Sequence, residues 1–364
     1  MAPPPELMDD VTAEILLRVP PDEPAHLFRA ALVCKPWLRL LTDPAFLRRY
    51  RAFHRTPPLL GFLHDLVPID DSRTLRFVPT AAASPLPQPA FAYWALDCRH
   101  GRVLLDMGVY SGNLAVWDPI TGDLQRLRDH EMPFCLYFSS VVLCTVGSCN
   151  HLDCKGGPFL VVSLGSDDLA GIMRACVYSS ESGAWGASAT VDVGPNYFVD
   201  AKRGALIGDE IYFTLKLGAK ILKYDLDKHC LFAIEPPDVY HGGAVLMPTE
   251  DSSLGFAGVR GSSLYLWSRK VNAKGIAGWV QCRIIELDKL FPDPCYQINV
   301  IGFAENVNVI FVSTYVGVFT VDLKSGQVKK VSDTGNYYAV AIPVMSFYTP
   351  DCASRKLPLL VEAN

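Results

Sequence analysis

The sequence contains no hydrophobic run long enough to cross a membrane as a helix. Its longest uncharged apolar-rich stretch, Phe134 to Gly147, is interrupted by serines, whereas a spanning helix needs about 20 apolar residues. The segment Met1 to Asp10 has neither the basic nor the apolar part of a secretory signal. We therefore expect no membrane partner and a location in the cytoplasm and/or nucleus, where the 11 cysteines stay reduced.

Charged residues are few, and positive charge is not in excess. Asp, Glu, Lys and Arg make up 20% of the 364 residues, and the formal net charge at pH 7 is -5. Nucleic acids are bound largely through clustered Lys and Arg that contact phosphates. This charge balance therefore argues against a nucleic-acid partner.

Common catalytic and cofactor motifs are missing from the sequence. There is no Gly-x-Ser-x-Gly, no phosphate-binding Gly-Lys-Ser/Thr and no His-Glu-x-x-His. The pair Asp167-Asp168 is more typical of a solvated turn than of a catalytic dyad, and the expected inner strands offer Val, Leu, Ser, Gly and Thr. We therefore expect a non-catalytic protein without a cofactor.

What the sequence does contain is a large apolar fraction and many turn residues. Half of the residues are hydrophobic, and Gly and Pro contribute 27 each. The apolar fraction predicts a folded protein with a sizeable core, and the turn residues favour a many-stranded fold. The length is typical of about two domains.

Residues 1–56 have helical periodicity. Val11, Ile15 and Val19 recur every four positions and form an apolar stripe that ends at Pro20-Pro21. Three further helix starts are marked by prolines: Pro24, Pro36 and Asp43-Pro44. The pattern predicts a small all-α module of four short helices, with more apolar surface than it can bury alone.

This segment resembles an F-box. The likeness rests on Leu7-Met8-Asp9-Asp10, on the Ile15-Leu16 pair, on Val33-Cys34-Lys35-Pro36-Trp37 and on Asp43-Pro44-Ala45-Phe46. Met8 stands where the family usually has proline. The resemblance implies that the module binds the Skp-type adaptor of a cullin–RING ubiquitin ligase. By position, the resemblance assigns the adaptor contacts to Leu7, Met8, Val11, Ile15, Leu16, Val19, Pro20, Leu32, Val33, Cys34 and Trp37.

From residue 57 the pattern changes to short β-type runs broken by Gly, Asp and Ser. A weak repeat places a hydrophobic residue before a polar tight turn and a second strand. Its anchor residues are Phe77, Trp117, Tyr178, Tyr224, Trp267 and Val321, at intervals of 40 to 61 residues. Such intervals are typical of propeller blades, so we predict an all-β propeller over residues 57–350, with six blades. A β-sandwich is the second interpretation.

The end of the repeat region predicts how the ring closes. Strands at Tyr338 to Ile342 and Val344 to Tyr348 follow the last anchor and could pair with the first blade. This region also resembles the kelch-like propeller that follows the F-box in a large class of plant proteins, on the turn at 117–122 and the segment 343–350. Residues 351–364 are expected to form a C-terminal tail.

A cysteine-rich segment is a candidate metal site. Cys149, His151 and Cys154 are close in sequence, and Cys144 could be a fourth ligand. Cys144, however, belongs to an apolar run in which cysteine packs as a small hydrophobic residue. We expect reduced thiols in a loop between strands, and keep a zinc site as the alternative.

Together these features predict the substrate-recognition subunit of a Skp–cullin–F-box ubiquitin ligase. By resemblance, the helical module binds the adaptor, and the propeller would hold a protein substrate that the sequence does not identify. Two alternatives stay open: a propeller interaction protein that acts outside any ligase, and a propeller enzyme.

Overall fold

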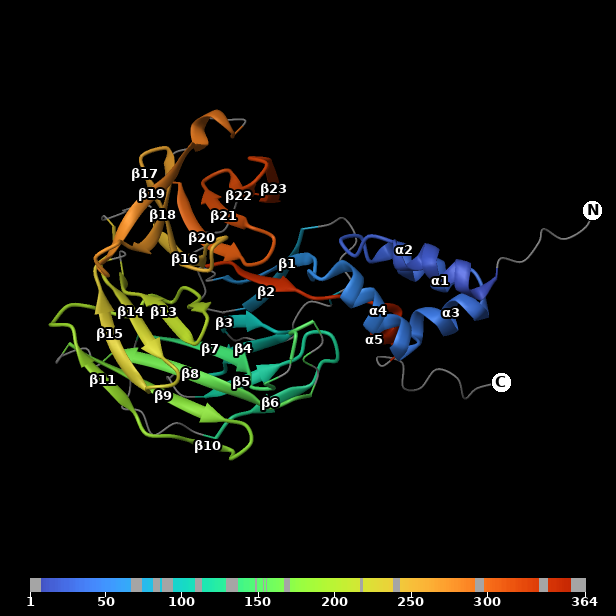
Figure 1. Cartoon of the computed structure of the whole chain (residues 1–364), viewed down its shortest axis with the longest axis horizontal. Coiled ribbons are helices and arrows are strands. Elements are labelled where there is room, and N and C mark those ends of the chain that lie inside the picture. The colour runs from blue at the N-terminus through green and yellow to red at the C-terminus, as the bar shows by residue number, and fades with distance from the viewer. Residues whose placement is uncertain are drawn as a thin grey trace, which may run out of the picture.

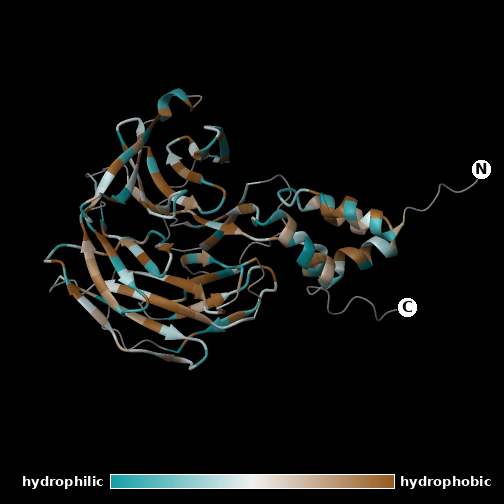
Figure 2. Cartoon of the chain, in the orientation of Figure 1, coloured by the Kyte–Doolittle hydropathy of each residue, from teal (hydrophilic) through white to brown (hydrophobic). Residues whose placement is uncertain are grey.

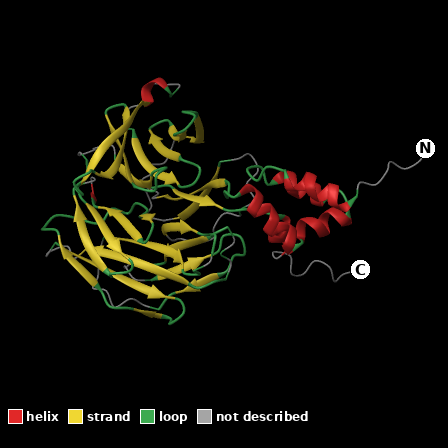
Figure 3. Cartoon of the chain, in the orientation of Figure 1, coloured by secondary structure: helices red, strands yellow, loops and turns green. Residues whose placement is uncertain are grey.

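A computed structural model describes most of the chain. The described residues are 8–66, 74–80, 86, 94–108, 113–128, 137–147, 149–152, 154, 156–166, 171–216, 219–237, 243–291, 298–333 and 340–354. The helical module lies at one end of the molecule and the β-structure at the other (Figure 1). Figure 3 shows that strands make up nearly all of the larger part.

The four predicted helices are confirmed. They are α1 (Asp9–Leu17), α2 (Ala25–Ala31), α3 (Lys35–Thr42) and α4 (Pro44–His54). Asp43 caps α4, because its carboxylate accepts a hydrogen bond of 2.8 Å from the Phe46 amide, and Pro44 fills the first position of that helix. Local capping therefore explains where α4 begins.

The helices share a small apolar core. Its members are buried or nearly so: Ala13, Leu16, Leu17, Leu27, Ala31, Leu41, Phe46, Leu47, Tyr50 and, from the far end of the chain, Phe347. The Tyr50 hydroxyl donates a 2.7 Å hydrogen bond to the carbonyl of Val19 and thereby ties α4 to the end of α1. Every helix of the module contributes to this core.

The remaining strands form the six-bladed propeller that the repeat predicts. Blade 1 is β24 (Ile342–Met345), β1 (Leu59–Leu66) and β2 (Thr74–Pro79); blade 2 is β3 (Trp94–Arg99), β4 (Arg102–Asp106), β5 (Leu114–Trp117) and β6 (Leu124–Arg126). Blade 3 is β7 (Phe138–Cys144), β8 (Phe159–Ser166), β9 (Ile172–Ser179) and β10 (Ala184–Trp185), with β11 (Ala189–Asp192) also paired to β9. Blade 4 is β12 (Ala205–Ile207), β13 (Glu210–Thr214), β14 (Ile221–Asp225) and β15 (Cys230–Ile234).

Blades 5 and 6 complete the ring. Blade 5 is β16 (Ala244–Pro248), β17 (Leu254–Arg260), β18 (Ser263–Val271) and β19 (Ala277–Glu286); blade 6 is β20 (Asn299–Ala304), β21 (Val309–Thr314), β22 (Gly317–Asp322) and β23 (Val328–Asp333). The first strands of adjacent blades contact one another, as β3 contacts β7 and β16 contacts β20. These strands therefore line the inside of the ring.

The predicted repeat has a physical basis in an aspartate turn. All six anchor residues lie on the third strand of their blade. After Trp117, the Asp118 carboxylate accepts hydrogen bonds from the backbone amides of Ile120 (2.8 Å) and Thr121 (3.1 Å). Gly122 then takes a positive φ of 86°, which glycine adopts without strain. Asp322 and Gly326 repeat this arrangement in blade 6.

The C-terminal strand closes the ring, as the sequence predicts. β24 pairs antiparallel with β1, so blade 1 combines strands from both ends of the chain. The sequence predicts two strands here, over 338–342 and 344–348, whereas the described residues form one, β24, which ends at Met345. Tyr338 and Ala339 of the first predicted strand lie outside the described part of the chain.

The residues after β24 pack on the helical module, a contact that the predicted boundaries at 350 and 351 miss. Phe347 is 3% exposed in the helical core, and its ring lies edge-on to Tyr50 at 6.1 Å. Tyr348 stacks on Phe28 at 5.3 Å, and the short helix α5 (Pro350–Ser354) contacts α2 and α3. Figure 1 shows α5 at the same end of the molecule as the helical module. The first residues of the expected tail are therefore part of the interface between the two domains.

The backbone of blade 6 closely approaches the residues before β24. The Ala341 amide donates a 2.8 Å hydrogen bond to Ile301, and a Cβ added to Gly302 would lie 2.3 Å from the Ala341 carbonyl oxygen. We expect Gly302→Ala to destabilise the propeller by about 1–3 kcal/mol, because the backbone must shift. Gly278→Ala is the matched control, since a Cβ there meets no atom within 4 Å. Equal midpoints of urea unfolding for the two variants would contradict the prediction.

Candidate functional site

The predicted adaptor contacts fall into an exposed group and a buried group. The large apolar side chains that are exposed are Met8 (73%), Val11 (39%), Ile15 (51%), Leu32 (85%) and Val33 (64%). Pro20 and Cys34 are exposed as well. Figure 2 shows hydrophobic residues on α1, α2 and α3, at the end of the molecule away from the propeller. We call Met8, Val11, Ile15, Leu32 and Val33 the apolar face.

The other assigned residues are buried, half-buried or outside the described part of the chain. Leu16 is 2% exposed and packs in the helical core, because the row of α1 that it occupies faces the other helices. Val19 and Trp37 are half-buried against the same core, and Leu7 lies outside the described residues. Leu38, at 42% exposed, is an apolar surface residue on α3 that the sequence pattern did not single out.

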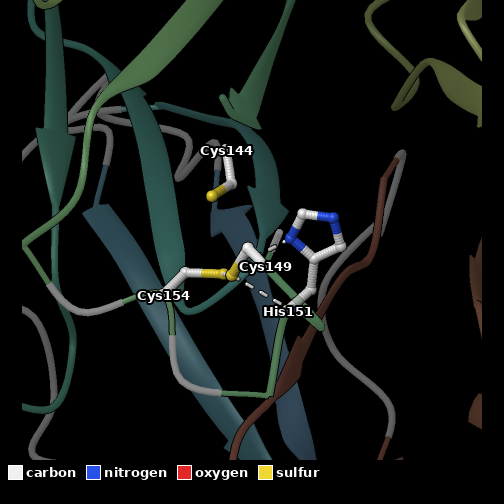
Figure 4. Close-up of side chains that lie close together, drawn as sticks. All are labelled: Cys144, Cys149, His151 and Cys154. Carbon is white, nitrogen blue, oxygen red and sulfur yellow. Dashed lines mark hydrogen bonds between the residues drawn. The ribbon is translucent and has the colours of Figure 1, made fainter. Parts of the chain in front are cut away.

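The cysteine-rich segment comes together around a single point. The Sγ atoms of Cys144, Cys149 and Cys154 and a ring nitrogen of His151 all lie within 4.8 Å of one another. Cys149 Sγ is 3.3 Å from Cys154 Sγ, and Cys154 Sγ is 3.4 Å from His151 Nδ1. Figure 4 shows the side chains of this cysteine cluster converging. The expectation that Cys144 packs as an apolar residue is wrong: it ends β7, half-buried, with its thiol in the cluster.

Neighbours from blade 2 hold the cluster in place. The imidazole of His100 stacks on His151 at 3.9 Å with the rings 12° apart, and His100 Nδ1 accepts a 3.2 Å hydrogen bond from the Cys144 amide. Arg102 donates from Nη2 to the carbonyls of Cys154 (2.9 Å) and Gly157 (2.5 Å). The loop between β7 and β8 is therefore fastened to β4 and to the turn before it.

The thiols differ in their readiness to ionise. Burial raises the pKa of the Cys154 thiol, and its hydrogen bond with Cys149 raises it further. Burial acts in the same direction on Cys144, but hydrogen bonds from the Val146 backbone and from neighbouring side chains, Arg102 among them, bring the pKa of that thiol below its usual value. Burial also lowers the pKa of His151, which favours the neutral imidazole that can ligate a metal.

The loop that carries the cluster also reaches the helical module. Leu152 packs against the helical core, together with Trp37 and Leu40. A cavity of about 580 Å³ lies beside this contact, and residues of both domains line it, among them Arg51, Arg55, Asn150, His151, Arg203 and Glu305. The cysteine cluster thus lies where the two domains meet.

A buried ion network that the sequence analysis missed lies on the inner side of the ring. It joins Asp97 and Arg99 of β3 to Arg203, before β12, and Glu305, after β20. Asp97 is 2.6 Å from Arg203 and 3.0 Å from Arg99, and Glu305 is 3.0 Å from each arginine. Asp97 also accepts a 3.0 Å hydrogen bond from the Val142 amide. The network therefore connects blades 2, 4 and 6 and reaches blade 3.

The ion network opposes protonation of its glutamate. Burial would raise the pKa of Glu305, but the guanidinium groups of Arg203 and Arg99 hold that pKa at about 2. The carboxylates of Asp97 and Glu305 are each paired with Arg99 and Arg203. Such pairing suits a role in holding the blades together better than a role in proton transfer. Asp167-Asp168, the pair weighed as a catalytic dyad, lies outside the described residues.

The depressed pKa of Glu305 predicts a pH dependence of stability. A carboxylate whose pKa falls on folding contributes stability above its ordinary pKa of about 4.3, and loses it as the pH falls towards about 2. We expect Glu305→Gln to be less stable than the original chain at pH 7 and the difference to shrink between about pH 4 and 2. Urea unfolding at several pH values measures it, and a constant difference would contradict the assignment.

Among the described residues, no helix is both long enough and apolar enough to span a membrane.

Comparisons with curated proteins and with solved structures find little similarity to this chain. A search of curated proteins finds no match to this chain. Among solved structures, it resembles the extracellular domain of the one-component system BT4673 from B. thetaiotaomicron, at TM-score 0.36 and 12% identity over 76% of this chain and 30% of that one. It also resembles a functionally unknown protein from Desulfotomaculum acetoxidans DSM 771, at TM-score 0.44 and 13% identity over 78% of this chain and 89% of that one. A protein from Lactobacillus plantarum is similar at TM-score 0.42 and 15% identity over 76% of this chain and 82% of that one. All three TM-scores are below 0.5, so nothing about this chain is concluded from them.

A family model described as F-box protein AT5G49610-like, beta-propeller, matches residues 94–351. The matched segment runs from the first strand of blade 2 through ring closure to the start of α5, which is well over half of the chain. The chain therefore belongs to this family of F-box-associated β-propeller proteins.

Proposed function

We propose that this chain is the substrate-recognition subunit of a Skp–cullin–F-box ubiquitin ligase. The helical module is then an F-box that binds a Skp-type adaptor, and the propeller, which we take to be kelch-like, holds a protein substrate. Membership of an F-box-associated propeller family and the helical module in front of the propeller support this assignment. In this proposal the protein acts in the cytoplasm and/or nucleus.

The observation that carries the proposal is the apolar face of the helical module. Exposed apolar side chains cost free energy in water, and about 25 cal/mol is recovered for each Å² that a partner covers. Met8, Ile15, Leu32 and Val33 are each more than half exposed, and all four occupy F-box positions assigned to adaptor contact. Clusters of this kind on helices are typical of surfaces that bind partner proteins.

The mechanism requires no bond-making residue in this chain. Holding a substrate on the propeller and the ligase on the helical module raises the local concentration of substrate lysines near the charged ubiquitin-conjugating enzyme. The contact of Phe347 and α5 with the helical module joins the two binding parts, so the distance between them stays defined. Positioning alone would then account for the contribution of this chain.

Direct binding to a purified Skp-type adaptor tests the proposal. We expect the full chain and the adaptor to elute together in size-exclusion chromatography as an equimolar complex. Affinity purification from cells followed by mass spectrometry should recover the adaptor, the cullin and the substrate together. Absence of the adaptor from both experiments would overturn the ligase role and favour a propeller protein that acts outside any ligase.

A further inference from the structure

We propose that Cys144, Cys149, His151 and Cys154 form a structural zinc site that fastens the loop 145–158 where the propeller meets the helical module. The site does not depend on the proposed ligase function, because it follows from the arrangement of the four side chains alone.

The donor set matches the coordination chemistry of zinc. Structural zinc sites have four ligands in a tetrahedron, and three cysteines with one histidine are a common combination. In a tetrahedron, Zn–S and Zn–N bonds of about 2.3 and 2.0 Å place two sulfur ligands about 3.8 Å apart and a sulfur and a nitrogen ligand about 3.5 Å apart. The Cys154–His151 distance of 3.4 Å is close to the second value, the Cys149–Cys154 distance of 3.3 Å is about 0.5 Å shorter than two zinc-bound sulfurs require, and all four atoms lie within 4.8 Å. Small side-chain rotations would complete the tetrahedron.

The cluster does not have the geometry of a disulfide or of an ordinary apolar core. A disulfide needs its sulfur atoms about 2.05 Å apart, and the 3.3 Å between Cys149 and Cys154 is too long. Three thiols and an imidazole also converge beside an arginine, whereas buried cysteines in a core are usually surrounded by aliphatic groups. Three thiols and an imidazole around one point form a donor set that suits zinc.

The surroundings suit a site of net negative charge. Zn²⁺ with three thiolates and a neutral imidazole carries one negative charge, since each thiol releases its proton on binding. Arg102 supplies the opposite charge: it is 7% exposed, hydrogen-bonds the Cys154 carbonyl, and its Nη1 has no hydrogen-bond partner among the described residues. His100 stacks on His151 and fixes the plane of its ring. Such neighbours usually orient metal ligands and tune their basicity.

The position of the cluster explains what the metal would do. Cys144 ends β7, whereas the other three ligands lie in the loop before β8, so a bound ion links the loop to the blade. The same loop presents Leu152 to the helical core. Zinc would therefore stabilise one of the contacts between the helical module and the propeller.

Metal content of the full chain tests the site. The protein is purified without a metal-affinity tag, and its zinc is measured by plasma mass spectrometry. We expect about one zinc per chain, and less than about a tenth of that in Cys154→Ser. Cys282→Ser is the matched control, because Cys282 is an exposed thiol on β19 in blade 5, and it should keep its zinc. Iron in place of zinc, or no stoichiometric metal, would overturn the proposal.

A second measurement covers the case in which Cys154→Ser does not fold. Zinc is stripped from the original chain with a chelator, and reactive thiols are counted before and after zinc is added back. We expect three thiols to become protected and the unfolding temperature to rise by several degrees, because metal binding stabilises the folded state. Unchanged thiol reactivity, or a Cys149–Cys154 disulfide found by peptide mapping, would overturn the site.

Discussion

Replacing Ile15 and Leu32 together by aspartate is expected to abolish binding to the Skp-type adaptor while leaving the unfolding temperature unchanged. Both side chains are exposed, at 51% and 85%, so neither supports the helical core. Covering a side chain of this size contributes about 1.5–3 kcal/mol, and an unpaired carboxylate in the interface adds a further cost. We therefore expect the dissociation constant to rise at least about 100-fold.

The choice of positions separates binding from folding. The neighbouring residue Leu16 is also apolar, but it is 2% exposed inside the helical core. Leu16→Asp would place a charge there and unfold the module, so loss of binding in that variant says nothing about the surface. Ile15 and Leu32 avoid this problem.

The control for this pair is an equally exposed apolar residue on the propeller. Ile276 is 62% exposed, next to the start of β19, far along the chain from the helical module. Ile276→Asp should bind the adaptor as the original chain does, which isothermal titration calorimetry measures directly. Unchanged affinity of the Ile15→Asp, Leu32→Asp variant would contradict the docking role of the apolar face.

Asp97→Ala is expected to destabilise the propeller by about 3–5 kcal/mol, because it removes one partner from a buried ion network. The Asp97 side chain is fully buried and accepts from Arg99, Arg203 and the Val142 amide. Its removal leaves two buried guanidinium groups with only Glu305 as a common partner. Removing one partner from a buried ion pair costs this much because the remaining charge stays out of water. Urea or thermal unfolding of the purified chain measures the loss.

An exposed ion pair provides the control for Asp97→Ala. Lys330 and Asp333 are 2.9 Å apart, with side chains 42% and 93% exposed. Asp333→Ala should change stability by less than about 1 kcal/mol, because water screens such pairs. An equal decrease in the free energy of unfolding of Asp97→Ala and Asp333→Ala would contradict the inference that the ion network holds the blades together.

Much of the fold could be predicted because the relevant signals are local. Asp43-Pro44 marks the start of α4, and the aspartate turn after Trp117 repeats after Val321, so short segments reveal helices and blades. The number of blades followed from the spacing of such turns. The pairing of β24 with β1 was predictable because a propeller must cover its open edge.

The contacts that were missed join residues far apart in the sequence. Asp97, Arg203 and Glu305 occupy three different blades, and no local pattern brings them together. β3 also carries a bulge between Ala95 and Asp97, which breaks the alternation of buried and exposed side chains that predictions rely on. Cys144 was expected to pack inside the apolar run of β7. It is the last residue of that strand, and the sequence pattern alone does not show where the strand ends.

The packing of Phe347 in the helical core has a consequence for synthesis on the ribosome. The helices are translated before the propeller, but Phe347, a core residue that they enclose, emerges only after blade 6, as does the strand that completes blade 1. Contacts between such distant residues form slowly, because a long chain must be ordered before they are made. A chain whose translation stops in blade 6 would lack both contacts, so the helical module can complete its core only after blade 6 has been made.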